Sequence, residues 1–225
     1  IADIDFIAVN SNPNKNITKK ISYGLKKSPG LSFMLDRVKA TQNKKNINKH
    51  IRDSFGNDFK GKIVKIEHHQ SHLASGHLAS PFDESISLSI DGLGDFVSTA
   101  WGIGEKNRVS MHDKIFFPHS LGIFYEALTH YLGFKNYGDE YKVMGLAPYG
   151  TDKFVDRLSE VLLLKDKGLF ELNLKYFVHQ NGNVQHTWEG GVPVSDDCYS
   201  KELEDLLGPS RLPNESLTQD HMDIA

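Results

Sequence analysis

Residues 62–72, KIVKIEHHQSH, are the stretch that decides the fold, because their period changes from that of a strand to that of a helix. Lys62 to Ile66 alternate charged and apolar side chains, as a half-buried strand does. From His68 onward the histidine and leucine positions recur at helical spacing instead. A strand that runs into a helix, followed by further segments of both kinds, predicts a mixed α/β chain.

The histidines of this stretch are candidate metal ligands. His68 and His72 are four residues apart, so on a helix both imidazoles project from one face, one turn from each other. Two neutral imidazoles and a carboxylate suit a divalent first-row metal and leave positions open for a substrate. His69 points elsewhere and is a weaker ligand candidate. Histidines at this spacing also occur as ordinary polar residues on a half-exposed helix, so that alternative stays open.

A second motif, DGLGD at 91–95, follows a run in which hydroxyl and aliphatic side chains alternate. That run, 85–90, is predicted to be a strand with one buried face. The two glycines permit positive φ, which would bring backbone N–H groups close to a nucleotide phosphate. Residues 96–103 look like a returning strand, so an ordinary hairpin turn explains the same sequence.

A third motif, GDEYKVMGLAPYG at 138–150, is dense in glycines and chargeable residues. It follows residues 120–134, whose apolar side chains fall at the spacing of an amphipathic helix. In this motif Glu140 is a candidate for bonding a ribose hydroxyl, and Lys142 for neutralising a phosphate. The competing interpretation is a capped helix start with a solvated charged face.

Four motifs in this order resemble the O-carbamoyltransferases of the nodulation-protein-U and cephalosporin-carbamoyltransferase type, which include the tobramycin carbamoyltransferase. They are HHQSH at 68–72, SIDGLGD at 89–95, PHSLG at 118–122 and GDEYKVMGLAPYG at 138–150. The resemblance covers most of the chain and is strongest from about Val64 to Gly150. Four ordered motifs are far more specific than any one of them.

The resemblance implies an actin/hexokinase-like ATPase fold of the ribonuclease H-like type, similar to the domain of the tRNA threonylcarbamoyl transferase. In the family a YrdC-like domain follows, where carbamoyl phosphate and ATP form carbamoyl-adenylate. The carbamoyl group then passes, with the help of iron, to a hydroxyl of a small-molecule acceptor. A carbamoyl carbonyl is a poor electrophile, so a Lewis acid and an adenylate leaving group both suit this reaction.

By motif, the resemblance implies that His68, His72 and Asp91 are the metal ligands. Fe(II) is the expected ion. Mn, Co and Zn are alternatives, because the metal that occupies such a site depends on its availability and on the coordination geometry. The acceptor hydroxyl needs a base. His69 and His119 are both candidates for that catalytic role, and the sequence does not choose between them.

The same resemblance implies a nucleotide site. Gly92, Gly94 and Asp95 would approach the phosphate of ATP, and Glu140 and Lys142 belong to the nucleotide-side motif. ATP and carbamoyl phosphate are therefore the expected co-substrates, and a hydroxylated small molecule is the expected acceptor.

Both ends of the chain depart from the family pattern. The chain begins IADID with no initiator methionine and without the family's glycine-rich phosphate turn, and it stops at DIA, before the YrdC-like domain. A fourth ligand, an aspartate, is expected beyond that point. We therefore expect residues 1–225 to be an incomplete N-terminal domain, inactive alone. Its parts would be a basic excursion at about 11–60, a motif core at 61–150 and a peripheral part at 151–225.

Charge is uneven along the chain. Residues 11–60 hold 12 Lys/Arg and 3 Asp/Glu, against 26 and 29 in the whole chain. This stretch, with a plausible helix at 31–38, is interpreted as a solvated basic face or as a lid that attracts anionic nucleotide or carbamoyl phosphate. Nucleic-acid binding is disfavoured because stacking aromatics are not interleaved with the basic residues.

The rest of the composition indicates the cellular location and leaves two alternative functions open. No apolar run approaches the ~20 residues of a membrane span. The single cysteine, Cys198, suits a reducing compartment, so we predict a cytoplasmic protein without a membrane partner; the oligomeric state is unknown from sequence. Two alternative functions stay open: a tRNA threonylcarbamoyl transferase, which shares the HxxxH pair, and a non-catalytic actin/heat-shock-type nucleotide-binding module, which would not need both histidines.

Overall fold

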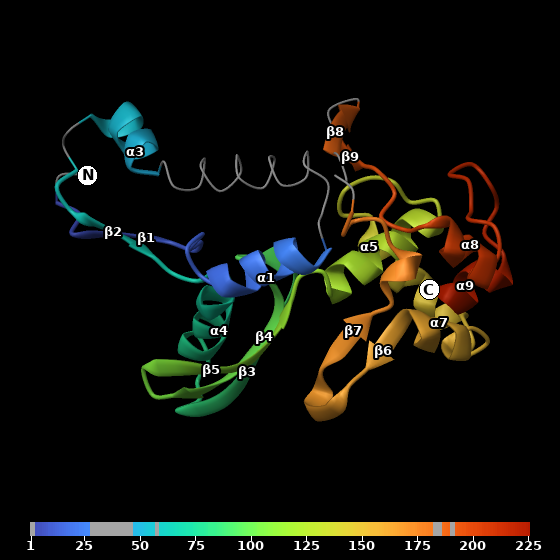
Figure 1. The fold of residues 1–225 in the computed structure, drawn as a ribbon, viewed down its shortest axis with the longest axis horizontal. Helices are drawn as coiled ribbons and strands as arrows, with labels where there is room; N and C mark the ends of the chain where they lie inside the picture. The colour runs from blue at the N-terminus through green and yellow to red at the C-terminus, as the bar shows by residue number, and fades with distance from the viewer. Residues whose placement is uncertain (1–2, 28–46, 57–58, 182–185, 190–191) are drawn as a thin grey trace. The chain divides into compact units, whose positions relative to one another are not determined.

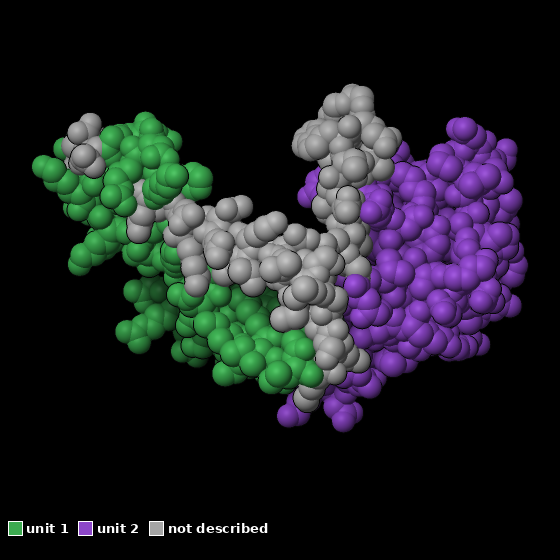
Figure 2. Space-filling view, turned by 45° about the horizontal axis from the view of Figure 1, so that its top comes forward, with its two compact units in different colours: residues 1–117 green, residues 118–225 purple. Residues whose placement is uncertain are grey.

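The computed structural model describes residues 3–27, 47–56, 59–181, 186–189 and 192–225. The chain divides into two compact units, residues 1–117 and 118–225 (Figure 2). The boundary falls inside the range 61–150, so the first two motifs belong to unit 1 and the last two to unit 2. The helix expected at 31–38, with much of the basic stretch, lies outside the described residues. The mixed α/β class predicted from the sequence is confirmed, while the likeness to actin and hexokinase stays a prediction.

Unit 1 contains a parallel strand pair. Strand β1 (Phe6–Val9) pairs in parallel with β2 (Lys62–Lys65), which confirms the strand predicted from the alternation. Parallel strands need a long crossover, and the connection carries helices α1 (Ile17–Lys27) and α3 (Ile47–Phe55) (Figure 1). β2 leads directly into helix α4 (His68–Leu78), so the change of period at His68 is confirmed.

The second sheet of unit 1 is antiparallel. Its strands, in order, are β3 (Glu84–Gly94), β4 (Val97–Glu105) and β5 (Arg108–Phe116). Helix α4 packs against this sheet and contacts all three strands (Figure 1). Leu73 of the helix is buried against Val97 and Ala100, which form a small apolar core.

The hairpin between β3 and β4 corrects one prediction. Gly92 and Gly94 lie inside β3, and neither has a positive φ. The turn residues are Asp95 (φ 49°) and Phe96 (φ 76°). Two central residues with positive φ are the signature of a type I′ turn, whose twist matches that of the flanking strands. The prediction that the glycines adopt positive φ is therefore wrong, and the hairpin alternative is confirmed.

Strand β3 has one buried face, as predicted, but it is the hydroxyl face. Ser87 and Ser89 are buried beneath α4, while Ile86 and Leu88 are exposed, Leu88 by 63%. The buried helix face carries histidines, whose ring nitrogens need hydrogen-bond partners inside the protein. Serine hydroxyls meet that need, and aliphatic side chains do not.

Unit 2 is mainly helical around one apolar core. Helix α5 (Leu121–Tyr131) begins at Ser120, whose hydroxyl accepts the Ile123 N–H at 3.2 Å, and confirms the amphipathic helix predicted at 120–134. The core gathers buried side chains along unit 2 from Ala127 in α5 to Ile224 near the C-terminus. The other elements are α6 (Glu140–Leu146), η1 (Ala147–Tyr149), α7 (Val155–Val161), β6 (Leu162–Leu164), η2 (Asp166–Gly168), β7 (Phe170–Leu172), η3 (Leu174–Tyr176), β8 (His186–Glu189), β9 (Val192–Ser195), α8 (Lys201–Leu207) and α9 (Gln219–Ile224).

Two short antiparallel pairs complete unit 2, β6 with β7 and β8 with β9. Among the described residues of the whole chain, no helix combines the length and apolar character needed to cross a membrane.

Candidate metal centre

The start of α4 is fixed by a side-chain cap. Glu67 occupies the N-cap position, and its Oε2 accepts the Gln70 N–H at 2.7 Å. Such a cap satisfies one of the backbone donors left unpaired at a helix start. The first turn is therefore ordered, and His68 and His72 project from the same face of the helix, as the four-residue spacing predicts.

Three side chains of unit 1 converge at this point. His68 Nε2 lies 2.7 Å from Asp91 Oδ2 and 3.0 Å from His72 Nε2, and His72 Nε2 lies 3.6 Å from Asp91 Oδ2. One ligand atom from each residue lies within 4.8 Å of the other two. Two ring nitrogens and a carboxylate oxygen aimed at one point are a donor set that fits a divalent first-row metal.

The surroundings of these three side chains orient them and could support a bound cation. Without a cation, His68 Nε2–H donates to Asp91 Oδ2 at 2.7 Å; a proton on Nδ1 instead, facing the Asn10 carbonyl at 3.3 Å, would free the Nε2 lone pair for a metal. Asp91 Oδ1 accepts the Gly92 N–H at 2.6 Å. Burial acts to raise the pKa of Asp91, but the hydrogen bonds from His68 and Gly92 outweigh it and hold that pKa below its usual value. The carboxylate is therefore charged at neutral pH.

The Asp95 carboxylate joins the residues after β1 to the start of α4, and we call this set of contacts the Asp95 clamp. Its Oδ2 accepts the N–H groups of Asn12 at 2.6 Å and His68 at 3.1 Å, and its Oδ1 accepts the Ser11 hydroxyl at 3.0 Å. The carboxylate is buried and lies at the N-terminus of α4, where the helix dipole favours a negative charge. These contacts support a structural role, and the nucleotide role predicted for Asp95 stays a prediction.

Gly94 provides the space that the cluster needs. A Cβ atom at this position would lie 2.0 Å from His68 Cδ2, so the imidazole rests against bare backbone. At Gly92 a Cβ atom would meet nothing within 4 Å. Of the two glycines predicted to approach a phosphate, Gly94 thus has a packing reason to be glycine. The phosphate role of both stays a prediction.

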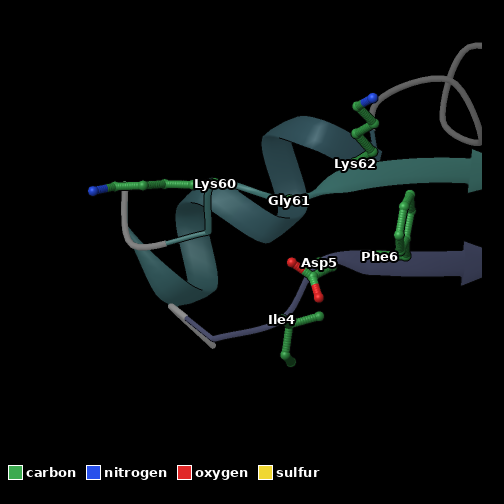
Figure 3. Close-up of a pocket in the computed structure, with 6 residues that line it drawn as sticks. All are labelled: Ile4, Asp5, Phe6, Lys60, Gly61 and Lys62. Atoms are coloured by element: carbon green, nitrogen blue, oxygen red, sulfur yellow. The ribbon is translucent and has the colours of Figure 1, made fainter.

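The cluster lies at the carboxyl ends of β1 and β2, because Asn10 follows β1 and His68 follows β2. Ligands of open α/β sheets bind at these ends. A surface pocket lies at the opposite ends of the same strands (Figure 3). It is lined by Ile4, Asp5, Phe6, Lys60, Gly61 and Lys62. The histidine cluster, and not this pocket, has the placement and the donor groups of a functional site.

Comparison with known proteins decides the family. Residues 4–189 match the family model described as carbamoyltransferase N-terminus. The chain belongs to this family.

Several curated relatives of this carbamoyltransferase N-terminal region are similar in sequence. An uncharacterized protein of Synechocystis sp. is 45% identical over 161 residues, which is 71% of this chain and 24% of the relative. Nodulation protein NolO of Bradyrhizobium diazoefficiens is 38% identical over 112 residues, 48% of this chain and 20% of the relative. Nodulation protein NolNO of Sinorhizobium fredii is 43% identical over 89 residues, which is 40% of this chain and 13% of the relative. The chain thus spans about a quarter or less of the length of these relatives.

His69, a predicted base of this carbamoyltransferase chain, is buried beside the cluster. Its Nε2–H donates to the Val97 carbonyl at 2.9 Å, and its Nδ1 accepts from the Ser89 hydroxyl at 2.8 Å. Burial lowers the pKa of His69. Both ring nitrogens are occupied, so the geometry supports a packing role; the catalytic role stays a prediction.

His77 is a buried histidine that the sequence reasoning did not single out. It lies eight residues after His69, on the same face of α4, and contacts the Ser85 hydroxyl at 2.7 Å and the Lys106 carbonyl at 2.9 Å. A Cβ atom at Gly104 would lie 2.2 Å from its ring. The sequence did contain a signal for this contact. His69 and His77 recur at helical spacing, and the strand that follows carries serines at alternate positions.

The remaining predicted site residues lie in unit 2, so the metal cluster is built without them. His119 Nδ1 accepts the Leu172 N–H at 3.0 Å. Lys142 forms an ion pair with Asp139 at 2.7 Å. Glu140 begins α6, and its carbonyl accepts the Tyr125 hydroxyl at 2.7 Å. Their predicted roles as base and nucleotide contacts are not tested by these local bonds.

Proposed function

We propose that this chain carries the metal site of an O-carbamoyltransferase. The reaction would move a carbamoyl group from carbamoyl phosphate, through carbamoyl-adenylate made with ATP, to a hydroxyl of a small-molecule acceptor. Membership of the carbamoyltransferase family supports the transferase class. The observation that carries the metal site is the convergence of His68, His72 and Asp91. Fe(II) is the proposed ion, and Mn, Co and Zn suit the same donors.

The side chains of the cluster have defined parts in this proposal. His68 and His72 would hold the cation through Nε2, and Asp91 through its carboxylate. When bound, the cation would supply Lewis-acid chemistry to the carbamoyl carbonyl. The Asn10 carbonyl orients His68, and the Gly92 N–H orients Asp91. The cluster is partly exposed, since the Asp91 side chain is 39% accessible, so a substrate atom can reach it.

The nucleotide and base assignments belong to the same proposal. Glu140 and Lys142 would lie on the nucleotide side, and His69 or His119 would take the acceptor proton. His69 and His119 stay alternatives for this base, because both nitrogens of His69 bond within the buried helix interface and His119 Nδ1 accepts the Leu172 N–H.

Metal binding tests the ligand set. Under anaerobic conditions, Fe(II) and Mn(II) affinities would be measured for the chain, for His72→Ala and for His50→Ala, which removes an exposed histidine of α3. Loss of one ligand should weaken binding by about 100-fold or more, since even residues that only support ligands contribute 10–100-fold. His50→Ala should bind like the parent. If His72→Ala also binds like the parent, the ligand assignment is wrong.

The transfer reaction needs a second experiment. In a full-length relative, this chain would replace the matching residues, with and without His68→Ala/His72→Ala. We expect ATP-dependent transfer of labelled carbamoyl to a hydroxylated small molecule. The double variant should lose transfer but keep ATP–pyrophosphate exchange, because adenylate formation belongs to the other domain in this proposal. Transfer of label from threonine to tRNA, assayed in parallel, would favour the threonylcarbamoyl alternative. Absence of any metal binding that depends on both histidines would favour the non-catalytic nucleotide-binding module, which does not need them together.

A further inference from the structure

A second group of ligand-type side chains lies in unit 2, separate from the cluster of unit 1. Helix α5 presents Glu126 and His130 four residues apart, so both project from one face. Cys198 comes from the segment between β9 and α8. One ligand atom from each of the three residues lies within 4.8 Å of the other two.

His130, a member of this group, has an unsatisfied ring nitrogen. Its side chain is 2% exposed, and Nδ1 has no hydrogen-bond partner among the residues that the structure describes. Asp197 Oδ1 lies 3.9 Å away, beyond hydrogen-bond distance, and forms an ion pair with Lys135. A buried ring nitrogen without a partner is costly and uncommon in folded proteins, so it calls for an explanation such as an ion.

Cys198 is held in place by its backbone. The Val178 N–H donates to the Cys198 carbonyl at 3.0 Å, beside the bridge between Phe177 and Tyr199. The Cys198 side chain is buried and its Sγ lies 3.9 Å from the Asp196 carbonyl. The thiol is therefore fixed toward α5 by a second segment of the chain, as a ligand from a different element would be.

The protonation states suit a site that binds a cation in place of a proton. Burial and the neighbouring Glu126 carboxyl raise the pKa of Cys198, so without a cation the group is a thiol. Burial lowers the pKa of His130, which keeps its imidazole neutral and able to donate a lone pair.

We propose that Glu126, His130 and Cys198 form a second metal site, which takes Zn²⁺. Thiolate, imidazole and carboxylate are the three ligand types that proteins offer to zinc. A hard cation such as Mg²⁺ or Ca²⁺ takes oxygen ligands and would leave the thiol unused. On binding, the Cys198 S–H bond breaks, a proton leaves to solvent and a Zn–S bond forms.

The charges balance in this site. With an ionised Glu126, the two negative ligands Glu126 and Cys198 match the two positive charges of Zn²⁺. A neutral assembly costs less to bury than an isolated charge. A cation bound through Nδ1 of His130 would give that unsatisfied atom a partner, and three protein ligands would leave a fourth position for water or another group.

Cobalt distinguishes this site from the histidine cluster of unit 1. The chain has one cysteine, so thiolate-to-Co²⁺ charge-transfer absorption in the near ultraviolet can come only from Cys198. We expect this band on titration of the chain with Co²⁺, and its loss when Zn²⁺ displaces the probe. His68→Ala/His72→Ala should keep the band in full, whereas His130→Ala should lose it.

The parent chain alone decides the outcome if a variant fails to fold. A folded chain saturated with Co²⁺ that shows no such band would overturn the proposal, as would a band that survives in folded His130→Ala. A thermal shift supplies an independent readout, because a ligand that binds only the native state raises Tm. Zn²⁺ should raise the Tm of His68→Ala/His72→Ala, and this rise should disappear when Cys198→Ser is added. A rise that persists without Cys198 would also overturn the site.

Discussion

The imidazole of His68 lies directly on the backbone of Gly94, where a Cβ atom would be 2.0 Å from His68 Cδ2. The same ring places Nε2 at 2.7 Å from Asp91. The absence of a side chain at Gly94 therefore sets both the packing of α4 and the geometry of the metal ligands.

Gly94→Ala should separate ligand geometry from fold. The added methyl group must push the His68 ring away, which costs about 1–3 kcal/mol as overpacking and moves Nε2 from Asp91. We expect the Mn(II) affinity, measured by calorimetry, to fall by at least about tenfold, in the range seen when ligand positioning is lost. Gly92→Ala is the matched control, because a Cβ atom there meets nothing. Equal affinities for the two variants would contradict this account.

Asp95→Asn should destabilise unit 1. An amide group cannot accept all three hydrogen bonds from Ser11, Asn12 and His68. Hydrogen bonds to a charged group contribute about 1.5–3 kcal/mol, so we expect a loss of that order in urea unfolding. Ser11→Ala removes one of these bonds and should cost only about 0.5–1.5 kcal/mol. A larger effect of Ser11→Ala than of Asp95→Asn would show that Asp95 is not the clamp.

The stability of the chain should fall as the pH drops below about 6.5. Burial lowers the pKa of His69 and of His130 from 6.5 in the folded chain. Between that value and the lower folded pKa, the unfolded chain binds more protons, so acid favours unfolding. Urea midpoints at pH 7.5 and pH 5.5 measure this loss. His69→Gln cannot titrate and should show a shallower pH dependence; a midpoint that rises on acidification would refute the assignment.

The aliphatic face of β3 should bind hydrophobic partners without supporting the fold. Because Leu88 is 63% exposed, Leu88→Ser should change the free energy of unfolding by less than about 0.5 kcal/mol. It should lower dye binding and concentration-dependent association, since exposed apolar patches promote both. The control is Leu73→Ala, which is buried and should cost about 2–5 kcal/mol. If Leu88→Ser is equally destabilising, the face is covered in solution.

Local patterns in the sequence predicted the elements that build the candidate metal centre. The alternation before Ile66 predicted β2, and the change of period at His68 predicted α4. The four-residue spacing placed His68 and His72 on one face. The position of Asp91 near the end of a strand made it a candidate third ligand.

Long-range contacts were beyond those patterns. The alternation of residues in β3 marks two faces of the strand. Which face is buried depends on the histidines of α4, which need the serine hydroxyls as partners. The clamp joins Asp95 to Ser11, 84 residues away. Cys198 likewise meets Glu126 and His130 only in the folded chain. No local period reports such pairs, because they follow from how distant segments pack.

The Asp95 clamp also has a kinetic consequence. It links the end of β1 to the start of α4, so His68 gains its full set of supporting contacts only after the long crossover between the parallel strands has closed. Closing so large a loop is entropically costly and slow compared with forming a hairpin. A cation held by His68, His72 and Asp91 would then bind after the folding barrier has been crossed. It would lengthen the lifetime of the folded unit by slowing unfolding, and would leave the rate of folding nearly unchanged.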